Sequence, residues 1–221
     1  MPIEDETVIS TQEQTAGRGQ QGALWQSQKG KSLAFSVFKR FSGLEISQQF
    51  MLSMAVSLAV QRALNTLGVP GVTVKWPNDI LSYNTKICGI LIENTVEGSQ
   101  IASSIIGAGI NVNETEFDNL PRAASLRMCT GISYDLDEVL QKVVGEILLE
   151  LNKISSSSIS EVKQRYEALL FKKDVVAVFE DSFGKRFNGC ILGVSDMGQL
   201  IVQTEDESQH LYSLKEITML Y

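Results

Sequence analysis

The sequence contains few histidines, cysteines and prolines. It has one histidine, His210, three cysteines and four prolines among 221 residues. A single histidine excludes a metal centre built from several histidines and any catalytic triad that needs a second one. The cysteines Cys88, Cys129 and Cys190 are odd in number and widely spaced. This pattern predicts buried thiols in a reducing cytosol and argues against zinc ligands or a disulfide framework.

Basic charge and long apolar runs are also scarce. Lysine and arginine number 19 against 26 acidic residues, which gives a net charge of -7, and there is no basic block. Because non-specific nucleic-acid binding depends on basic patches, this excess of acid predicts no nucleic-acid partner. No apolar run approaches the ~18 residues of a membrane span, and no signal-peptide pattern begins the chain. We therefore predict a cytoplasmic protein without membrane contact.

The hydrophobic residues, 43% of the chain, fall into helical and strand-like segments. A segment at 46–67 that is apolar almost all round predicts a buried central helix. Asp135 with Glu138 predicts a capping box that opens a helix running to about residue 153, and Ser158 with Glu161 predicts another ending near residue 171. Strands are predicted at 7–12, 33–38, 72–76, 87–96 and 100–112, the last two as an antiparallel hairpin.

The pattern of the sequence changes after residue 171. Short apolar or alternating runs at 175–180, 185–194, 200–204 and 210–213 are separated by turn-forming segments. Four or five short strands in such a short stretch predict a small β-barrel of the SH3-like type. We therefore predict two domains, residues 1–171 and residues 172–221.

Three glycines between Gly17 and Gly22 spell G-x-G-x-x-G, but no helix follows them as a dinucleotide-binding loop requires. Residues 25–31 have no helical period of apolar residues, so we predict a long polar loop between two strands. Arg18 and Trp25 suit a flap that closes over an anionic ligand with an aromatic face. Taken alone, an ordinary surface loop explains the segment better, because glycine-rich motifs have many false matches.

A second feature is the end of the strand at 72–76, where Trp76 and Pro77 are followed by two polar residues. This arrangement fixes Asn78 and Asp79 on a rigid corner. If Asp79 faces a cleft, its carboxylate is suited to orient an incoming amine or to accept its proton. A simple Asx-type turn without function explains the same residues equally well.

A third feature is Lys86, which opens a strongly apolar strand, either as a solvated strand end or as a cation above a pocket floor. Gly89 in this strand, and Gly107 and Gly109 in the next, weaken the sheet unless something approaches their backbone closely. Neighbouring strands with interior glycines predict a ligand lying flat on the sheet. Arg122 follows in a loop that could border this ligand, but surface solvation is the better explanation of that residue alone.

Together the three features resemble one family, the biotin–protein ligases, also called holocarboxylase synthetases. The matching motifs, in family order, are Gln14-x-x-Gly-Arg-Gly-x-x-Gly-x-x-Trp25, Lys75-Trp-Pro-Asn-Asp79, Lys86-x-x-Gly-Ile-Leu-Ile-Glu93 and Gly107-x-Gly-Ile-Asn-Val112. The resemblance covers nearly the whole chain. It implies an α+β fold, with helices packed on a mixed, largely antiparallel sheet of the class II synthetase-like type, followed by a small SH3-like β-barrel.

The resemblance implies an ATP-dependent ligase. In the family, the carboxylate of biotin attacks the α-phosphate of ATP to give biotinyl-5′-AMP and pyrophosphate. A lysine of a biotin carboxyl carrier protein then takes the biotinyl group. Because two anions meet in the first step, fixed cations and Mg2+ are needed. The implied small molecules are therefore ATP, biotin and Mg2+, the last held mainly by ATP, and the implied assembly is a monomer or a homodimer.

The resemblance also assigns roles to individual residues. Lys86 spans the carboxylate and the α-phosphate, Arg18 closes with the flap, and Asp79 handles the incoming lysine. The implied biotin contacts are Gln14, Gly17, Arg18, Lys86, Gly89 and Leu91. The implied nucleotide contacts are Gly19, Gln20, Trp25, Asn78, Lys86, Gly107 and Asn111. No protein ligand to a metal is implied.

The sequence departs from the family pattern in the flap and at the N-terminus. Gln20 and Ala23 stand where many members carry basic residues, so the flap has two fewer positive charges. Residues 1–6 do not contain the Ser-Thr-Asn segment that binds biotin in the family, and no winged-helix DNA-binding domain precedes them. We therefore expect no role in transcription. The alternatives are a lipoate–protein ligase-like enzyme and a non-catalytic paralogue that binds the adenylate or the carrier.

Overall fold

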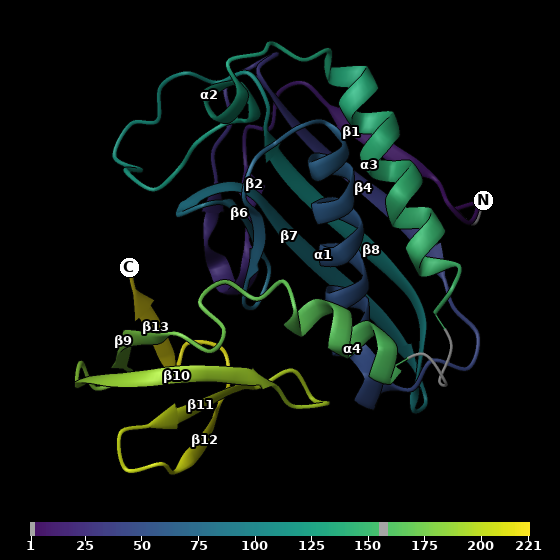
Figure 1. Ribbon diagram of the computed structural model, residues 1–221. Helices are drawn as coiled ribbons and strands as arrows, with labels where there is room; N and C mark the ends of the chain where they lie inside the picture. Colours follow the sequence, from purple (N-terminus) through teal and green to yellow (C-terminus); the bar gives the residue numbers. More distant parts are fainter. Residues whose placement is uncertain (1–2, 155–158) are drawn as a thin grey trace.

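The computed structural model describes residues 3–154 and 159–221, and these residues contain two large antiparallel sheets and a small two-stranded one (Figure 1). Helices cover one face of the larger sheet, and the smaller sheet lies at one end of it (Figure 1). This arrangement agrees with the predicted α+β class. The boundary at 171/172 between two domains stays a prediction.

The large sheet has six strands in the order β1-β4-β8-β7-β6-β5, and all neighbours are antiparallel. Its strands are β1 (Val8–Thr11), β4 (Ser32–Arg40), β5 (Val72–Lys75), β6 (Asp79–Ser82), β7 (Thr85–Glu97) and β8 (Gln100–Asn111). β7 and β8 form the predicted hairpin. The sequence predicts only a turn at 77–79, whereas Asp79 already begins β6, because this short strand pairs with β5 on one side and β7 on the other.

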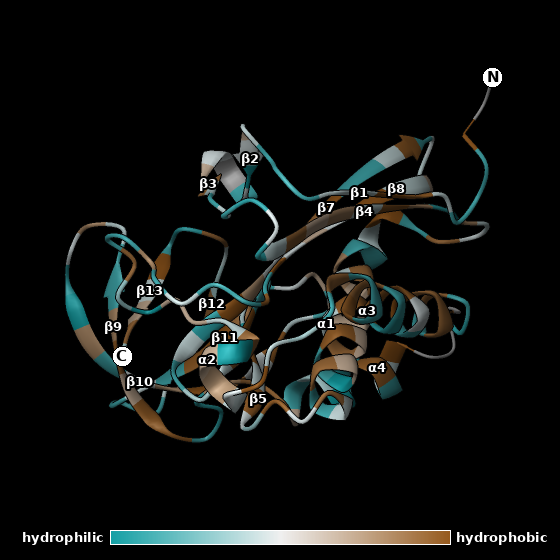
Figure 2. Cartoon of the chain, turned by 90° about the horizontal axis from the view of Figure 1, so that it is seen from above, coloured by the Kyte–Doolittle hydropathy of each residue, from teal (hydrophilic) through white to brown (hydrophobic). Residues whose placement is uncertain are grey.

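The helices α1 (Gln49–Thr66), α3 (Leu136–Leu151) and α4 (Ile159–Glu167) lie on one side of the large sheet (Figure 2). Buried side chains occur all round α1, for example Leu52, Met54 and Leu64 on three different sides, so the predicted buried central helix is confirmed. It begins later than predicted because residues 46–48 form a 3-10 turn closed by a capping box from Glu45.

The remaining helices differ from the predictions in their ends. Asp135 caps α3 as predicted, since its carboxylate accepts hydrogen bonds from the backbone of Asp137 and Glu138. α4 ends before residue 171 because the following residues leave the helix and exchange backbone hydrogen bonds with Val74 of β5. The predicted cap at Ser158 lies outside the described residues. A short helix that the sequence did not predict, α2 (Leu126–Thr130), starts at a Ser125 cap.

The segment predicted as a polar loop contains a small two-stranded ribbon, β2 (Gly17–Arg18) and β3 (Leu24–Trp25), joined by a 3-10 turn (Gln20–Gly22). We call residues 14–25 the flap. Figure 2 shows this ribbon on the side of the large sheet opposite α1, α3 and α4. The flap therefore stands over the open face of the sheet.

The smaller sheet has five antiparallel strands in the order β12-β11-β10-β9-β13, as expected of an SH3-like domain. Its strands are β9 (Val176–Asp181), β10 (Arg186–Val194), β11 (Leu200–Thr204), β12 (Gln209–Tyr212) and β13 (Ile217–Leu220). A turn of this sheet contacts the large domain at Gly198. The indole nitrogen of Trp76 donates a hydrogen bond of 2.8 Å to its carbonyl oxygen. A Cβ atom at Gly198 would collide with the ring of Phe50, so this contact requires glycine.

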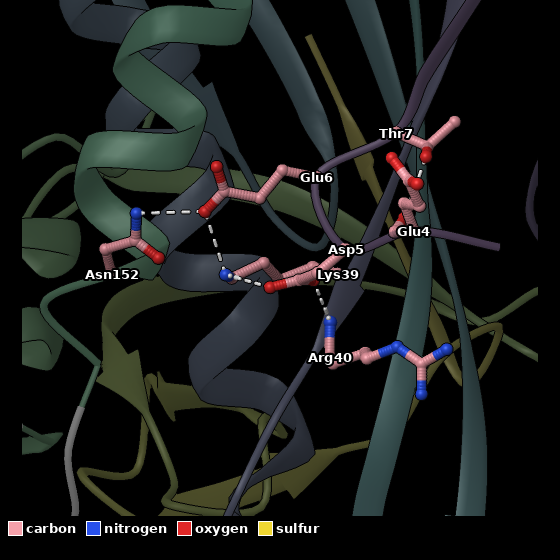
Figure 3. A network of polar contacts seen from close by, with 7 residues as sticks. All are labelled: Glu4, Asp5, Glu6, Thr7, Lys39, Arg40 and Asn152. Carbon is pink, nitrogen blue, oxygen red and sulfur yellow. Dashed lines mark hydrogen bonds and ion pairs between the residues drawn. The ribbon is translucent and has the colours of Figure 1, made fainter.

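The residues before β1 are tied to the large sheet and to α3 by a network around Lys39 (Figure 3). The buried Lys39 ammonium lies 2.9 Å from Asp5 and 3.0 Å from Glu6, and Asn152 donates a hydrogen bond to Glu6. Burial raises the pKa of Asp5, but hydrogen bonds from Lys39 and from the backbone of Arg40 lower it by more. The Lys39 hydrogen bond also lowers the pKa of Glu6.

In the described part of the chain, no helix has both the length and the apolar character needed to cross a membrane. The three cysteines are free thiols, as predicted. Cys88 is fully buried, and burial raises its pKa to about 12, so this thiol stays protonated. Cys129 and Cys190 are only partly buried, in contrast to the prediction.

Candidate active site

A cavity of about 600 Å³ opens on the face of the large sheet that carries the flap. Its walls come from the flap, from strands β1, β4, β6, β7 and β8, from the corner between β5 and β6, and from the smaller sheet. The three segments that the sequence singled out are therefore brought to one place.

The corner between β5 and β6 is held by backbone pairing on both sides. Lys75 and Asp79 are direct partners across the β5–β6 pair, and the Trp76–Pro77 peptide between them is cis. Asn78 donates its side-chain amide to the carbonyl of Ile90 at 2.6 Å and accepts the backbone N–H of the same residue at 3.0 Å. The amide of Asn78 thus fixes the corner against β7 while the residue lines the cavity.

Lys86 and Asp79 form an ion pair at the floor of the cavity, with 2.6 Å between the ammonium nitrogen and a carboxylate oxygen. The Asp79 side chain is 18% exposed and the Lys86 side chain 36% exposed. Both groups are therefore reachable from the cavity yet partly shielded from water. This pair combines a cation that can neutralise an anionic substrate with a carboxylate that can receive a proton.

Trp25 of the flap lies against the strands beneath it. Its indole lies over a cross-strand pair of glycines, Gly89 of β7 and Gly109 of β8. A side chain at Gly109 would collide with this ring, and one at Gly89 would press against it. The group that closely approaches these glycines is thus the tryptophan of the flap. The glycines can be explained by this contact without a ligand.

Two polar groups of the flap have weak partners or none. The indole N–H of Trp25 is buried and makes no hydrogen bond among the described residues. Arg18 is 75% exposed and lies 3.9 Å from Glu93 of β7, at the limit of an ion pair. Exposed pairs of this kind contribute little to stability. The Arg18 guanidinium is therefore available to an anion in the cavity.

The loop after β8, residues 113–125, makes hydrogen bonds both next to the flap and at Lys86. Glu114, a buried carboxylate, accepts a short hydrogen bond from the backbone of Gln28, just beyond the flap. Asn111 donates its amide to the carbonyl of Ala124 at 3.0 Å, and the carbonyl of Arg122 accepts the backbone N–H of Lys86 at 2.7 Å. These bonds place the loop 113–125 beside Lys86.

Most of the predicted site residues line the cavity. These are Gln14, Arg18, Gly19, Gln20, Trp25, Asn78, Asp79, Lys86, Gly89, Leu91 and Gly107. Gly17 and Asn111 do not line it: a side chain at Gly17 would collide with the backbone of Trp25, and Asn111 is buried beneath the loop 113–125. The individual contacts to biotin and to nucleotide stay predictions for all of these residues.

Sequence reasoning missed several residues of the site. Lys75 lines the cavity beside Asp79, although only its place in a motif marked it. Tyr221, which follows β13, has the guanidinium of Arg122 and the ammonium of Lys75 over its ring. No local pattern signals these contacts, because they join segments far apart in the sequence.

The described residues were also searched for side chains that could hold a metal ion. Within residues 3–154 and 159–221, no group of three or more histidine, cysteine, aspartate or glutamate side chains could hold an ion.

Comparison with known proteins gives the family of the chain. Residues 2–111 match the model of the biotin/lipoate A/B protein ligase family. The chain belongs to this family. One relative is the bifunctional ligase/repressor BirA of Bacillus spizizenii, which is 28% identical over 216 residues, covering 94% of this chain and 64% of BirA. Another is the biotin–[acetyl-CoA-carboxylase] ligase of Paracoccus denitrificans, 32% identical over 106 residues, or 47% of this chain and 43% of that protein.

The fold of this ligase-family chain is that of known biotin protein ligases. The biotin protein ligase of Aquifex aeolicus, solved in complex with biotin and ATP, superposes with a TM-score of 0.80 at 28% identity. The match covers 100% of this chain and 91% of the Aquifex chain. The predicted fold class, with a small β domain after the α+β domain, is confirmed.

Proposed function

We propose that this protein is an ATP-dependent ligase that activates biotin as biotinyl-5′-AMP and transfers the biotinyl group to a lysine of a biotin carboxyl carrier protein. The observation that carries the proposal is the Lys86–Asp79 ion pair, at 2.6 Å, on the floor of a cavity closed by a glycine-rich flap. The name of the Paracoccus denitrificans relative, a biotin–[acetyl-CoA-carboxylase] ligase, and the Aquifex aeolicus structure in complex with biotin and ATP support the same substrates.

In the first step, a carboxylate oxygen of biotin forms a bond to the α-phosphorus of ATP. The bond from that phosphorus to the bridging oxygen breaks, and pyrophosphate leaves with the electron pair. Lys86 neutralises the two anions as they meet, and Arg18 adds charge from the flap. Mg2+, held by the phosphates, would supply further positive charge.

In the second step, the carrier lysine attacks the acyl carbon of the adenylate, and AMP leaves. The attacking amine loses a proton, and the Asp79 carboxylate is placed beside Lys86 to receive it or to orient the amine. The Lys86–Asp79 ion pair would thus serve both steps.

The flap protects the intermediate. A mixed anhydride hydrolyses readily, so a ribbon that covers the open face of the sheet excludes water during the two steps. Gln14, Gly17, Gly89 and Leu91 would contact biotin. Gly19, Gln20, Trp25, Asn78, Gly107 and Asn111 would contact the nucleotide. Residues 1–171 would form the catalytic domain and residues 172–221 the small β domain.

The sharpest test is Lys86→Ala. We expect biotin-dependent pyrophosphate release to fall by about a hundred- to a thousandfold, because a fixed cation at the reacting phosphate is lost. Pyrophosphate release is measured with purified protein, ATP, Mg2+ and biotin. Lys142→Ala is the matched control, since Lys142 is an exposed lysine on α3 outside the cavity. Full exchange of pyrophosphate into ATP by Lys86→Ala would contradict the assignment.

The same assay separates the alternatives. Lipoate in place of biotin should give no pyrophosphate release; a preference for lipoate would favour the lipoate–protein ligase alternative. Biotin binding by calorimetry without pyrophosphate release or carrier labelling would favour a non-catalytic paralogue.

A further inference from the structure

Three cations gather around a single carboxylate at the corner of the site. Lys75 is the cross-strand partner of Asp79, and Lys86 forms the ion pair with that residue. The backbone of Arg122 bonds to that of Lys86, and the Arg122 guanidinium lies near enough to Lys75 to lower the pKa of that lysine. Three positive groups and one negative group leave a net formal charge of +2 at this point. In the part of the chain that the structure describes, neither Lys75 nor Arg122 forms an ion pair with a carboxylate.

The aromatic ring of Tyr221 holds two of these cations. The guanidinium carbon of Arg122 lies 4.3 Å from the ring centroid, and the ammonium of Lys75 lies 5.6 Å from it. The ring of Phe171 packs edge-on against Tyr221 at 5.1 Å, and the Phe171 backbone bonds to Val74, the neighbour of Lys75. The tyrosine is thereby wedged between β5 and the loop of Arg122.

A ring holds a cation differently from a carboxylate. A carboxylate would neutralise Lys75 and Arg122, whereas the face of a neutral ring attracts both and leaves their charge intact. Burial is the main cause that lowers the pKa of Lys75, and Lys86 and Arg122 lower it further. The Asp79 carboxylate raises the pKa of Lys75 again, but one carboxylate does not balance the three cations at the corner. This excess of positive charge forms a site for an anion with several charges.

We propose that Tyr221 is a positioning residue of the active site, which holds Lys75 and Arg122 toward the phosphates of the nucleotide and toward the pyrophosphate that leaves. The inference rests on the proposed function, because it assigns these cations to the leaving group of the first step. When the bond between the α-phosphorus and the bridging oxygen breaks, negative charge grows on that oxygen. The cations beside Tyr221 would stabilise it there.

The test compares two variants of one residue. Tyr221→Phe keeps the ring, whereas Tyr221→Leu keeps only apolar bulk. We expect Tyr221→Leu to raise KM for ATP and the inhibition constant of pyrophosphate by roughly five- to tenfold. KM for biotin should stay within about twofold in both variants. Tyr221→Phe should lie closer to wild type than Tyr221→Leu, because it keeps the cation–π contacts and loses only the hydrogen bond between the hydroxyl and Arg122.

Tyr212→Leu is the matched control, because it removes another partly buried tyrosine from the smaller sheet, one that stacks on Phe187 without a cation over its ring among the described residues. Thermal melting checks that all variants fold. The proposal is overturned, and Tyr221 is only structural, if Tyr221→Phe or Tyr212→Leu is as impaired as Tyr221→Leu. It is overturned equally if KM for ATP and KM for biotin rise together in Tyr221→Leu. Unchanged constants in Tyr221→Leu overturn it as well.

A binding measurement separates this inference from the proposed function. Calorimetric titration of the free protein with inorganic pyrophosphate, with and without Mg2+, needs no turnover. Weaker binding to Tyr221→Leu than to Tyr221→Phe supports the anion site, and equal binding overturns it. Absence of biotin-dependent pyrophosphate release in the wild-type protein would instead overturn the proposed function.

Discussion

The corner at 75–79 and the flap at 14–25 line the same cavity, yet the chain holds them by different means. The corner is paired with strands on both sides, and Trp76 ties it to the smaller sheet. The flap has only a ribbon of two strands with two residues each, and its side chains Arg18 and Leu24 are largely exposed. Groups that must keep their positions thus lie on paired backbone, and groups that must admit a substrate lie where few contacts need to break.

The largest effect on ligand binding through the flap is expected from Gly109→Val. The new side chain would occupy the place of the Trp25 indole and force the flap off the sheet. We expect biotin affinity, measured by calorimetry, to fall by about a hundredfold, equivalent to roughly 2.7 kcal/mol. Gly145→Ala is the control, because a side chain there meets nothing within 4 Å on the exposed side of α3. Unchanged affinity in Gly109→Val would show that flap closure does not need this contact.

A smaller effect on binding, without an effect on folding, is expected from Arg18→Gln. Affinity for a non-hydrolysable biotinyl-AMP analogue should fall by about tenfold, because a charged hydrogen-bond donor is lost. The free energy of unfolding should change by less than about 0.5 kcal/mol, since the ion pair to Glu93 is exposed and 3.9 Å long. A clear loss of stability would mean that the flap is as firmly built as the corner.

Trp76→Phe, a change in the corner, should lower stability, unlike the flap variant Arg18→Gln. Removing the indole N–H leaves the carbonyl of Gly198 without its 2.8 Å bond, so we expect a loss of about 1 kcal/mol in urea unfolding. Trp25→Phe is the matched control, because the Trp25 indole N–H has no partner among the described residues and no hydrogen bond is lost. Equal losses in the two variants would contradict the contrast between corner and flap.

The smallest effect concerns the network around Lys39, away from both regions. Asp5 and Glu6 have pKa values lowered in the folded state, so their contribution to stability is present at neutral pH and is lost as pH falls through those lowered values. We expect Lys39→Met to reduce stability by about 1 kcal/mol or less at pH 7, because both carboxylates are partly exposed and screened. The difference from wild type should shrink in urea unfolding at pH 3. A difference that does not change with pH would mean that only packing is lost.

The corner was easier to predict from the sequence than the flap. Asp79 and Lys86 stand in short motifs whose residue types carry the chemistry, and hydrophobic runs predicted β5 and β7, the two neighbours of the strand that carries Asp79. The glycines Gly89 and Gly109 predicted a close approach, which we assigned to a ligand, because a glycine shows only that space is needed. Trp25 fills that space from another segment of the chain.

Other elements escaped prediction because their stabilising contacts are distant in sequence. β6 has only four residues, and its pairing with β5 and β7 makes it a strand. The turn-forming residues at its start hide this strand from a reading of the sequence. The end of α4 is set by backbone bonds to Val74. Lys75, Arg122 and Tyr221 come from three separate segments, and the spacing within any one of them carries no sign of the contact.

The contact between Gly198 and Phe50 has a practical consequence for anyone who shortens this chain. A fragment that stops at residue 171 would uncover the ring of Phe50 and the indole of Trp76 together, and would strip both of their covering turn. Such a fragment should aggregate during purification because it exposes this apolar surface. Residues 172–221 should therefore be kept in any shortened version of the chain.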